Sequence, residues 1–231
     1  MAWHHLTDVQ WGVSRSVRQG GLFMCLKKPA FVGFSLLVFC TVMVLPLHIR
    51  GETPGPAQVI SRFNVALIEA MRGGKELGFS GRYRLLEPVV TETFLPPYMA
   101  SVSVGRHWKT LTEEQQRQFE EIYAEWLIAN YAKNFHAYAG ERFEITKQSQ
   151  TAGGAAVLSK LLNAQGKETE FDYRLRLTED AWRIVDIRIS GVSQLANTRA
   201  QFVSVLDKNG FDELVASLKR KIGEFSRSDG Q

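Results

Sequence analysis

The apolar residues of this chain change their spacing twice, and this change limits the folds that the chain can adopt. From Pro56 to Gly140 they recur at three- and four-residue steps, which is the period of a helix with one apolar face. Between Gly140 and Gly191 they alternate with polar residues, as in strands with one buried face, and after Gly191 the helical period returns. Helices, then strands, then helices again predict an α+β fold.

Four strands are expected in the alternating region, and short turns separate them. Consecutive strands joined by short turns pair in antiparallel fashion, so the sequence predicts a four-stranded meander. Strict alternation in the last strand places Val185, Ile187 and Ile189 on one face. Trp182 and Ile184 then lie on the other face, so both faces of this strand carry large apolar residues. The predicted strands cover residues 142–149, 156–163, 170–177 and 182–189.

Six helical segments are expected around this sheet. The first ends at Gly73-Gly74, the second is bent or restarted at Pro88, and a Thr112-to-Gln115 capping box starts a long aromatic helix that runs to Gly140. Asn209-Gly210 separates the last two helices. The predicted helices cover residues 56–71, 85–94, 96–104, 112–140, 194–207 and 211–225.

Residues 1–57 are expected to be an export signal or a membrane anchor. Two lysines precede an almost uninterrupted apolar run over residues 29–47, about as long as the shortest membrane span. Met24 opens an ordinary short charged segment before this run, which predicts that translation starts there. The folded domain is then expected to cover residues 58–231.

The composition argues against several classes of function. The net charge of +4 is mild and the basic residues are spread along the chain, so no nucleic-acid partner is expected. Both cysteines, Cys25 and Cys40, lie in or near the N-terminal apolar segment, which excludes thiol chemistry in the domain beyond it. His107 and His136 lack further ligands at metal-binding spacing, and G-x-S-x-G, H-E-x-x-H and glycine-rich nucleotide motifs are absent. We therefore expect no metal and no cofactor.

Asp186 is the most suggestive single carboxylate of the sequence. A cone-shaped α+β fold can hold an acid in an apolar cavity and use it as a proton-transfer base. The alternative is an ion pair with Arg174, Arg176 or Arg188 on the same or the neighbouring strand. The sequence supplies no second catalytic group, which favours the ion pair.

Aromatic residues are numerous in the predicted helices and strands, and few polar residues accompany them. Most such residues pack in an ordinary core, but a sheet wrapped by helices with many bulky apolar groups also suits a lipid-sized cavity. Burying a lipid's hydrocarbon removes several hundred Å² of apolar surface from water at roughly 25 cal/mol per Å², which suffices for binding without polar contacts. Release would then be slow, so a carrier would need a partner that opens the cavity.

Several motifs carry a resemblance to a known family. Residues 182–193 contain W-x-I-x-D-x-x-I-x-G-V-S, and residues 197–202 contain N-x-R-x-Q-F. Upstream, the run from Leu86 to Val90 and a spaced set of aromatic residues follow in order. Together they resemble the toluene-tolerance, or lipid-asymmetry-maintenance, family of MlaC-type periplasmic phospholipid carriers. The block over residues 134–144 is most similar to the branch associated with hopanoid biosynthesis.

This resemblance implies an NTF2-like cone in which a four-stranded antiparallel sheet is wrapped by N- and C-terminal helices. It implies a monomeric, non-enzymatic periplasmic protein that moves a hopanoid or a phospholipid between the inner and outer membranes. Its partners would be an inner-membrane transporter complex and an outer-membrane acceptor, and an uncleaved N-terminal segment would tether it to the inner membrane. The cavity walls, chosen by the face on which each residue lies, are expected to be Tyr83, Leu86, Val90, Phe94, Tyr123, Trp126, Leu127, Tyr173, Leu175, Val185, Ile187 and Phe202.

Two other functions stay open at this point. The first is an NTF2-like enzyme that acts on a hydrophobic substrate with Asp186 as general base, and turnover abolished by Asp186→Asn would favour it. The second is a membrane-anchored assembly factor that binds proteins and no lipid.

Overall fold

The computed structural model describes residues 54–151, 153–179 and 181–228. The helices are α1 (Pro56–Thr93), α2 (Pro96–Val104), the short 3-10 helix η1 (Gly105–Thr110), α3 (Glu113–Asn134) and α4 (Gln194–Ser228). The strands are β1 (Arg142–Thr151), β2 (Gly154–Leu162), β3 (Glu168–Leu177), β4 (Trp182–Ile189) and β5 (Val192–Ser193). This order confirms the predicted α+β class. It also confirms the break between the last two helices, since α4 leaves helical geometry at Gly210.

The strands form one antiparallel sheet in the order β1-β2-β3-β4-β5. The predicted count of four strands is therefore one short, because β5 adds two residues that pair with Arg188 and Ile189. Ser190 and Gly191, with φ of 49° and 83°, make the two-residue turn before it. A strand of two residues is too short to show alternation, so the periodicity of the sequence could not reveal it.

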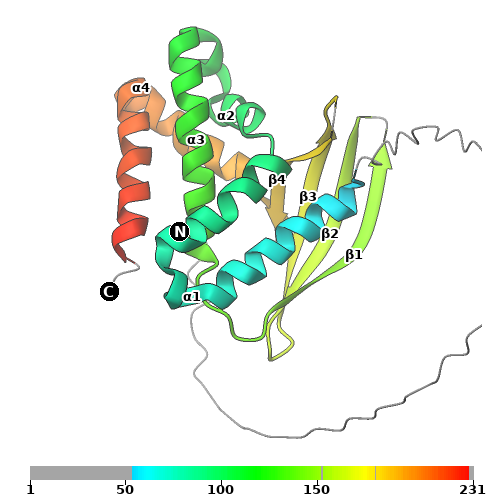
Figure 1. The fold of residues 1–231 in the computed structure, drawn as a ribbon. Coiled ribbons are helices and arrows are strands. Elements are labelled where there is room, and N and C mark those ends of the chain that lie inside the picture. The colour runs from blue at the N-terminus through cyan, green and yellow to red at the C-terminus, as the bar shows by residue number, and fades with distance from the viewer. Residues whose placement is uncertain (1–53, 152, 180, 229–231) are drawn as a thin grey trace, which may run out of the picture. The chain divides into compact units, whose positions relative to one another are not determined.

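One face of the sheet is covered by helices, and α1 crosses this face between the sheet and α3 (Figure 1). Phe63 of α1, Tyr173 of β3 and Ile184 of β4 are all fully buried between these layers. The opposite face carries charged side chains such as Arg174 and Arg188, and no helix of the described residues covers it. The core therefore lies between one face of the sheet and the helices.

α1 contains two breaks, and both lie at glycines with positive φ. These are Gly74, with φ of 38°, and Gly78, with φ of 58°. The predicted end of the first helix at Gly73-Gly74 is thus confirmed. The next helical segment begins well before Leu85 and continues through Pro88 without a non-helical residue there, so the helix does not restart at Pro88. Glycine adopts positive φ without steric cost, so the chain changes direction at the glycines upstream of the proline.

α3 starts as predicted but ends at Asn134 rather than at Gly140. At its start the capping box is present: Gln115 N donates to Thr112 Oγ1 at 3.2 Å, and Thr112 N donates to Gln115 Oε1 at 3.0 Å. After Asn134 the chain leaves helical geometry, so the predicted helix is too long at its C-terminal end.

Side chains contact the last backbone carbonyl groups of α3, where the helix ends earlier than predicted. Arg82 Nε donates to Ala132 O at 2.9 Å, and His136 Nδ1 lies 2.9 Å from Lys133 O. Arg82 also donates from Nη1 to Gly74 O at 2.6 Å, and only 1% of its surface is exposed. One buried arginine thus joins the break in α1 to the end of α3, where helix carbonyls lack partners of their own.

A β-bulge in β4 changes which residues share a face. The pairing with β3 shifts by one residue between Ile184 and Asp186, which leaves Val185 as the extra residue. The alternation is reversed beyond the bulge, so Ile187 joins Ile184 on the face that the helices cover. The prediction that these two residues lie on opposite faces is therefore wrong.

The predicted export signal or anchor lies outside the described residues as far as residue 53, and with it the proposed start at Met24, Cys25 and Cys40. In the part of the chain that the structure describes, no helix has the length and apolar character that crossing a membrane requires. In the same residues, no group of three or more histidine, cysteine, aspartate or glutamate side chains is placed to hold a metal ion.

Candidate functional site

Aromatic rings from α1, α3 and β3 meet where α1 crosses the sheet. The ring centroid of Phe63 lies 4.9 Å from that of Phe94 and 5.0 Å from that of Tyr131. The ring of Tyr173 lies 6.3 Å away, and all three contacts have edge-to-face geometry. We call Phe63, Phe94, Tyr131 and Tyr173 the sheet-side cluster.

Buried hydrogen bonds fix this cluster to the sheet. The Tyr173 hydroxyl donates to Asn64 Oδ1 at 2.7 Å, and Asn64 Nδ2 donates to Ser159 Oγ at 3.3 Å. All three side chains are buried. Burial, followed by the nearby Tyr131, raises the pKa of Tyr173 well above its ordinary value. Tyr173 therefore stays a neutral donor, and α1 is held to β2 and β3 in one register.

A second group of rings lies between α3 and α4. Phe202 of α4 lies 5.3 Å from Trp126 and 6.4 Å from Tyr123, both on α3. Phe119 lies 6.1 Å from Phe202 and 6.2 Å from Phe211. We call Phe119, Tyr123, Trp126, Phe202 and Phe211 the helix-side cluster. Within the described residues, the buried Trp126 Nε1 has no hydrogen-bond partner, which is uncommon for a buried donor.

Asp186 lies at the start of α4 and caps it. The Ser193 hydroxyl donates to Asp186 Oδ2 at 2.7 Å, and Leu195 N donates to Asp186 Oδ1 at 3.1 Å. These bonds satisfy a backbone donor that the first turn of a helix leaves without a partner. The ion pair that the sequence favoured for Asp186 is wrong, because both oxygens of Asp186 accept these bonds and, within the described residues, no ion pair joins it to Arg174, Arg176 or Arg188. Asp186 thus has a role that neither sequence interpretation anticipated.

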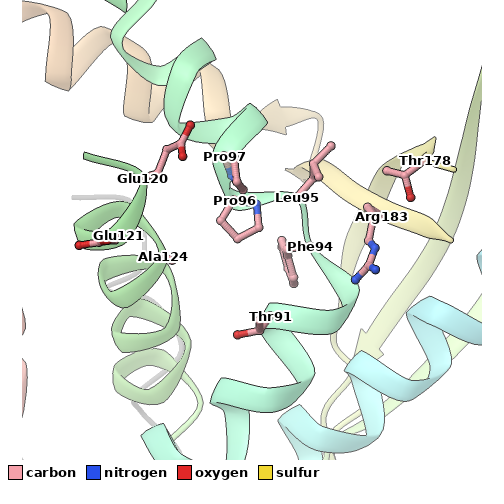
Figure 2. A pocket seen from close by; sticks show the side chains of 10 residues that line it. All are labelled: Thr91, Phe94, Leu95, Pro96, Pro97, Glu120, Glu121, Ala124, Thr178 and Arg183. Carbon is pink, nitrogen blue, oxygen red and sulfur yellow. The ribbon is translucent and has the colours of Figure 1, made fainter. Parts of the chain in front are cut away.

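A groove with a volume of about 540 Å³ opens beside the sheet-side cluster (Figure 2). Phe94, Leu95 and Pro96 lie between α3 and β4 in this view. Phe94 belongs both to the groove and to the sheet-side cluster, so the floor of the groove is part of the apolar core. The lining residues are Thr91, Phe94, Leu95, Pro96, Pro97, Glu120, Glu121, Ala124, Thr178 and Arg183.

Backbone contacts fix the floor of this groove to the sheet. Phe94 forms a parallel bridge with Ile184, and Leu95 N donates to Ile184 O at 3.0 Å. Arg183 Nη1 donates to the carbonyl oxygen of Glu92. The corner between α1 and α2 therefore behaves as a short extra strand beside β4, which keeps the groove in place.

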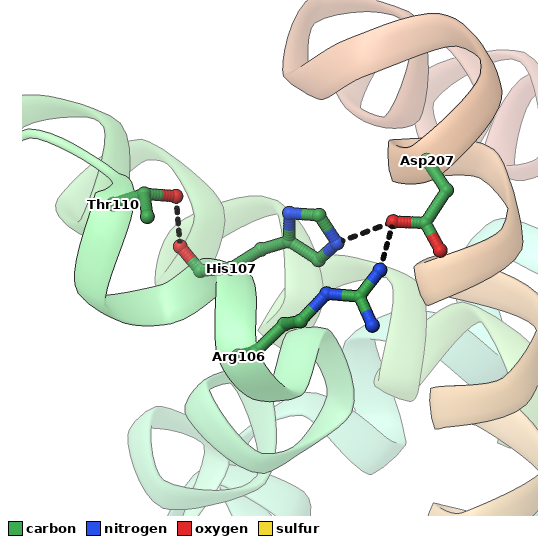
Figure 3. Close-up of polar contacts among 4 residues, drawn as sticks. All are labelled: Arg106, His107, Thr110 and Asp207. Carbon is green, nitrogen blue, oxygen red and sulfur yellow. Dashed lines mark hydrogen bonds and ion pairs between the residues drawn. The ribbon is translucent and has the colours of Figure 1, made fainter.

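An exposed ionic contact joins η1 to α4 (Figure 3). Arg106 Nη2 and His107 Nε2 lie 2.7 Å and 2.8 Å from the same oxygen, Asp207 Oδ1. Partial desolvation acts to raise the pKa of Asp207, but the hydrogen bonds from His107 and Arg106 outweigh it and hold that pKa below its usual value. This contact lies at the surface and holds η1 to α4, the helix that also carries Phe202.

The sequence and the fold agree on a family. The family model described as MlaC protein matches residues 62–220, which is more than half of the chain. The chain belongs to the MlaC family. Membership confirms the family part of the resemblance, while the hopanoid-associated branch stays a prediction.

Two known proteins are similar to this chain. The intermembrane phospholipid transport system binding protein MlaC of Haemophilus influenzae is 22% identical over 148 residues, which are 60% of this chain and 69% of that protein. A solved structure of the phospholipid-binding protein from Ralstonia solanacearum, in complex with a phospholipid, superposes with a TM-score of 0.63. It is 22% identical and the match covers 74% of this chain and 96% of that one. This likeness shows a shared fold.

The structure brings most of the predicted cavity residues into one core. Tyr83 and Trp126 are only partly buried and pack against its edge. Val185, the bulged residue, is buried but lies apart from the core that the others form. The nine predicted residues within the core are Leu86, Val90, Phe94, Tyr123, Leu127, Tyr173, Leu175, Ile187 and Phe202.

Sequence reasoning missed the residues that organise this core and its opening. Phe63 stood in the predicted pattern of the first helix, and its central position in that pattern was the available signal. Asn64 and Arg82 gave no signal in the sequence, because the hydrogen bonds that define their roles are made with residues far away in the chain. No sequence pattern distinguishes Arg183 and Glu120 from other charged residues, and only the fold places both of them at one groove.

Proposed function

We propose that this member of the MlaC family is a periplasmic, non-enzymatic lipid-binding protein that carries a lipid between the inner and outer membranes. The observation that carries the proposal is the groove whose floor residue, Phe94, also packs in a large aromatic core. The names of both relatives support it, since one is the binding protein of an intermembrane phospholipid transport system and the other was solved with a phospholipid.

Side chains fill the interior, so a hydrocarbon chain enters by taking the place of ring-to-ring contacts. Such an exchange keeps apolar surface out of water before and after entry. It therefore costs little hydrophobic free energy, provided that the surrounding helices can separate. The helix-side cluster meets this condition best, because ring contacts rather than buried hydrogen bonds join Phe202 to α3.

The cargo is a phospholipid or a hopanoid. The names of both relatives favour a phospholipid. The sequence block over residues 134–144 favours a hopanoid. Either lipid would contact the residues predicted as cavity walls, above all the nine that lie in the core.

Slow release of the bound lipid implies that the carrier needs partner proteins. A lipid buried in an apolar interior leaves slowly, so a complex at the inner membrane and an acceptor at the outer membrane would each open the protein. The carrier would act as a monomer between them. The rival enzyme with Asp186 as general base draws no support from the site, because both oxygens of Asp186 accept the hydrogen bonds that cap α4.

Photochemical capture in living cells tests the proposal with the full chain. A photoreactive phenylalanine analogue replaces Leu95, which lines the groove and is partly exposed, in a host that makes both phospholipids and hopanoids. After illumination, mass spectrometry of the purified protein identifies the adduct. The matched control carries the analogue at Val65, an α1 residue that is 53% exposed.

We expect a lipid adduct at Leu95 and none at Val65. A phospholipid or a hopanoid adduct would identify the cargo. Equal capture at both positions would mean random contact with membranes, and a folded protein without any lipid adduct at Leu95 would refute the carrier function.

A further inference from the structure

The ionic contact between η1 and α4 is open to solvent, although it joins two separate segments of the fold. The side chains of Arg106 and Asp207 are 73% and 40% exposed. His107 Nε2 lies 2.8 Å from the same Asp207 oxygen that Arg106 contacts (Figure 3). An exposed ion pair contributes little to stability, so a second carboxylate can take the place of the first. This site therefore holds a carboxylate that a competitor from outside can replace.

Three further cations belong to the same two segments. Arg199 of α4 lies against Gly105, since a Cβ at Gly105 would be only 2.8 Å from Arg199 Nη2. Lys109 lies one turn after the first arginine of η1, where side chains of a 3-10 helix stand above one another. Lys208 directly follows the acceptor carboxylate. Within the described residues, no ion pair holds the side chains of Lys109, Arg199 or Lys208, so these charges are available to a partner.

Acidic side chains leave this surface positively charged. The one acidic residue in η1 and in residues 194–209 of α4 is Asp207. At the start of α3, Glu113 and Glu114 both pair with Arg117, at 3.9 Å and 2.5 Å. Four cations thus stand against one carboxylate, and their combined field attracts anionic groups. We call the four cations the basic face, which comprises Arg106, Lys109, Arg199 and Lys208.

The first half of α4, residues 194–209, lies between two glycines with positive φ. Gly191 has a φ of 83° and Gly210 a φ of 81°, and a Cβ at Gly210 would meet no atom within 4 Å. Glycine lets the chain turn at such points without steric cost. Between them the segment carries Phe202 of the helix-side cluster, and near its end Asp207 contacts η1. Loss of that contact would leave the end of this segment held mainly by apolar packing.

We propose that the basic face is the docking surface for an acidic segment of a partner protein. Carboxylates of the partner contact Arg106 and His107 in place of Asp207, and this exchange releases the first half of α4 from η1. The inference rests on the proposed function, because the released helix packs on α3 through Phe202 of the helix-side cluster. Guanidinium groups fit carboxylates in a planar, charge-assisted geometry, and Asp207 already occupies the place that such a carboxylate would take.

A protein carboxylate fits this surface better than the phosphates of a membrane. Helices that lie on membranes combine basic residues with large apolar side chains that enter the lipid. Among the large hydrophobic residues that the described chain exposes, none lies in η1 or in residues 194–209. The basic face thus offers charge without an apolar anchor, which favours an acidic protein.

A synthetic peptide of ten glutamates tests the docking with the full chain, and a peptide of ten glutamines is the uncharged control. Fluorescence anisotropy of the labelled peptide measures its affinity. Arg199→Glu with Lys208→Glu reverses two charges of the basic face. Lys219→Glu with Lys221→Glu makes the same change at exposed residues of the second half of α4. We expect only the glutamate peptide to bind, with an affinity that falls about tenfold in the first variant and less than about twofold in the second.

Hydrogen exchange of backbone amides, followed by mass spectrometry, measures the release of α4. Bound glutamate peptide, or Asp207→Asn without peptide, should speed exchange in residues 194–209 by about threefold to tenfold and leave residues 211–225 unchanged. Glu213→Gln is the matched control, because it removes a similarly exposed ion pair with Arg220 in the second half of α4. It should not change exchange in residues 194–209.

Absence of peptide binding, or equal weakening by both double variants, would overturn the docking surface. Binding without faster exchange in residues 194–209 would overturn the release of α4. Faster exchange with phosphatidylglycerol vesicles but not with the peptide would assign the basic face to a membrane and overturn the inference as well. All these results leave the carrier function standing, because lipid capture at Leu95 tests it separately. A chain that binds the peptide but captures no lipid would keep the docking surface and lose the carrier function.

Discussion

The sheet-side and helix-side clusters are both aromatic, but they are held together differently. Around Phe63 the rings are joined to the sheet by the buried hydrogen bonds among Tyr173, Asn64 and Ser159. Around Phe202 the contacts are between rings, and a buried donor at its edge, Trp126 Nε1, has no partner in the described residues. Ring packing is tolerant of small displacements, whereas a buried hydrogen bond is lost with them.

This difference assigns different tasks to the two regions. The sheet-side cluster fixes α1 on the sheet and keeps the groove floor in place through Phe94. The helix-side cluster holds α3 and α4 together by contacts that a hydrocarbon chain can replace. Substitutions in the first region should therefore lower the free energy of unfolding in proportion to the contacts removed. Removal of a polar group from the second region should lower it little.

The largest effect is expected from Phe63→Ala in the sheet-side cluster. Phe63 is fully buried and contacts three other rings, so its removal leaves a cavity among fixed neighbours. We expect the free energy of unfolding to fall by about 3–5 kcal/mol. Urea unfolding of the full chain measures it, and Val65→Ala on the exposed side of the same helix is the control. A loss below about 1 kcal/mol would show that this cluster is as adaptable as the other.

Tyr173→Phe tests the hydrogen bonds alone. The substitution keeps the ring and leaves Asn64 Oδ1 buried without its donor. We expect the free energy of unfolding to fall by about 1–2 kcal/mol, the usual cost of a buried acceptor without a partner. Thermal and urea unfolding should agree on this value. If stability does not change, the register of α1 on the sheet is set by packing only.

Trp126→Phe makes the matching change in the helix-side cluster. The lost indole N–H has no acceptor within the described residues, so its removal relieves a desolvation penalty that offsets the smaller ring. We expect a change in the free energy of unfolding of less than about 1 kcal/mol. A larger loss, measured under the same urea conditions as Tyr173→Phe, would mean that Trp126 contributes a specific polar contact.

The smallest expected effect on stability comes from Asp207, and it depends on pH. Desolvation acts to raise the pKa of Asp207, but His107 and Arg106 outweigh it and hold that pKa below its usual value. The folded state therefore favours the charged carboxylate. This contribution is present above the usual aspartate pKa and is lost as the pH falls through the lowered one. Asp207→Asn should therefore lower the melting temperature slightly at neutral pH and make no difference at strongly acidic pH. A difference that grows on acidification would have the wrong sign.

Local sequence signals predicted much of this fold. The capping box of α3, the breaks at Gly74 of α1 and Gly210 of α4, and the ends of β4 depend on neighbouring residues, and the structure has them in the predicted places. The family followed from ordered motifs along the chain and is confirmed.

The rest depends on contacts between distant residues. The end of α3 is set with the help of Arg82, which is 50 residues away from Ala132 in the sequence. The bulge at Val185 appears only in the pairing of β4 with β3, so alternation alone assigned the faces of Ile184 and Ile187 wrongly. The groove likewise brings together Glu120 and Arg183 from elements that no sequence pattern connects.

The most direct test of the carrier account is whether hydrocarbon reaches the interior between α3 and α4. A photoreactive phenylalanine analogue at Trp126, a position that already holds a large ring, is illuminated in cells that express the full chain, and adducts are identified by mass spectrometry. Val65, on the exposed side of α1, is again the control position. The account predicts adducts attached through the hydrocarbon part of a lipid at Trp126 and none at Val65. A folded protein that captures no lipid at Trp126 would contradict it.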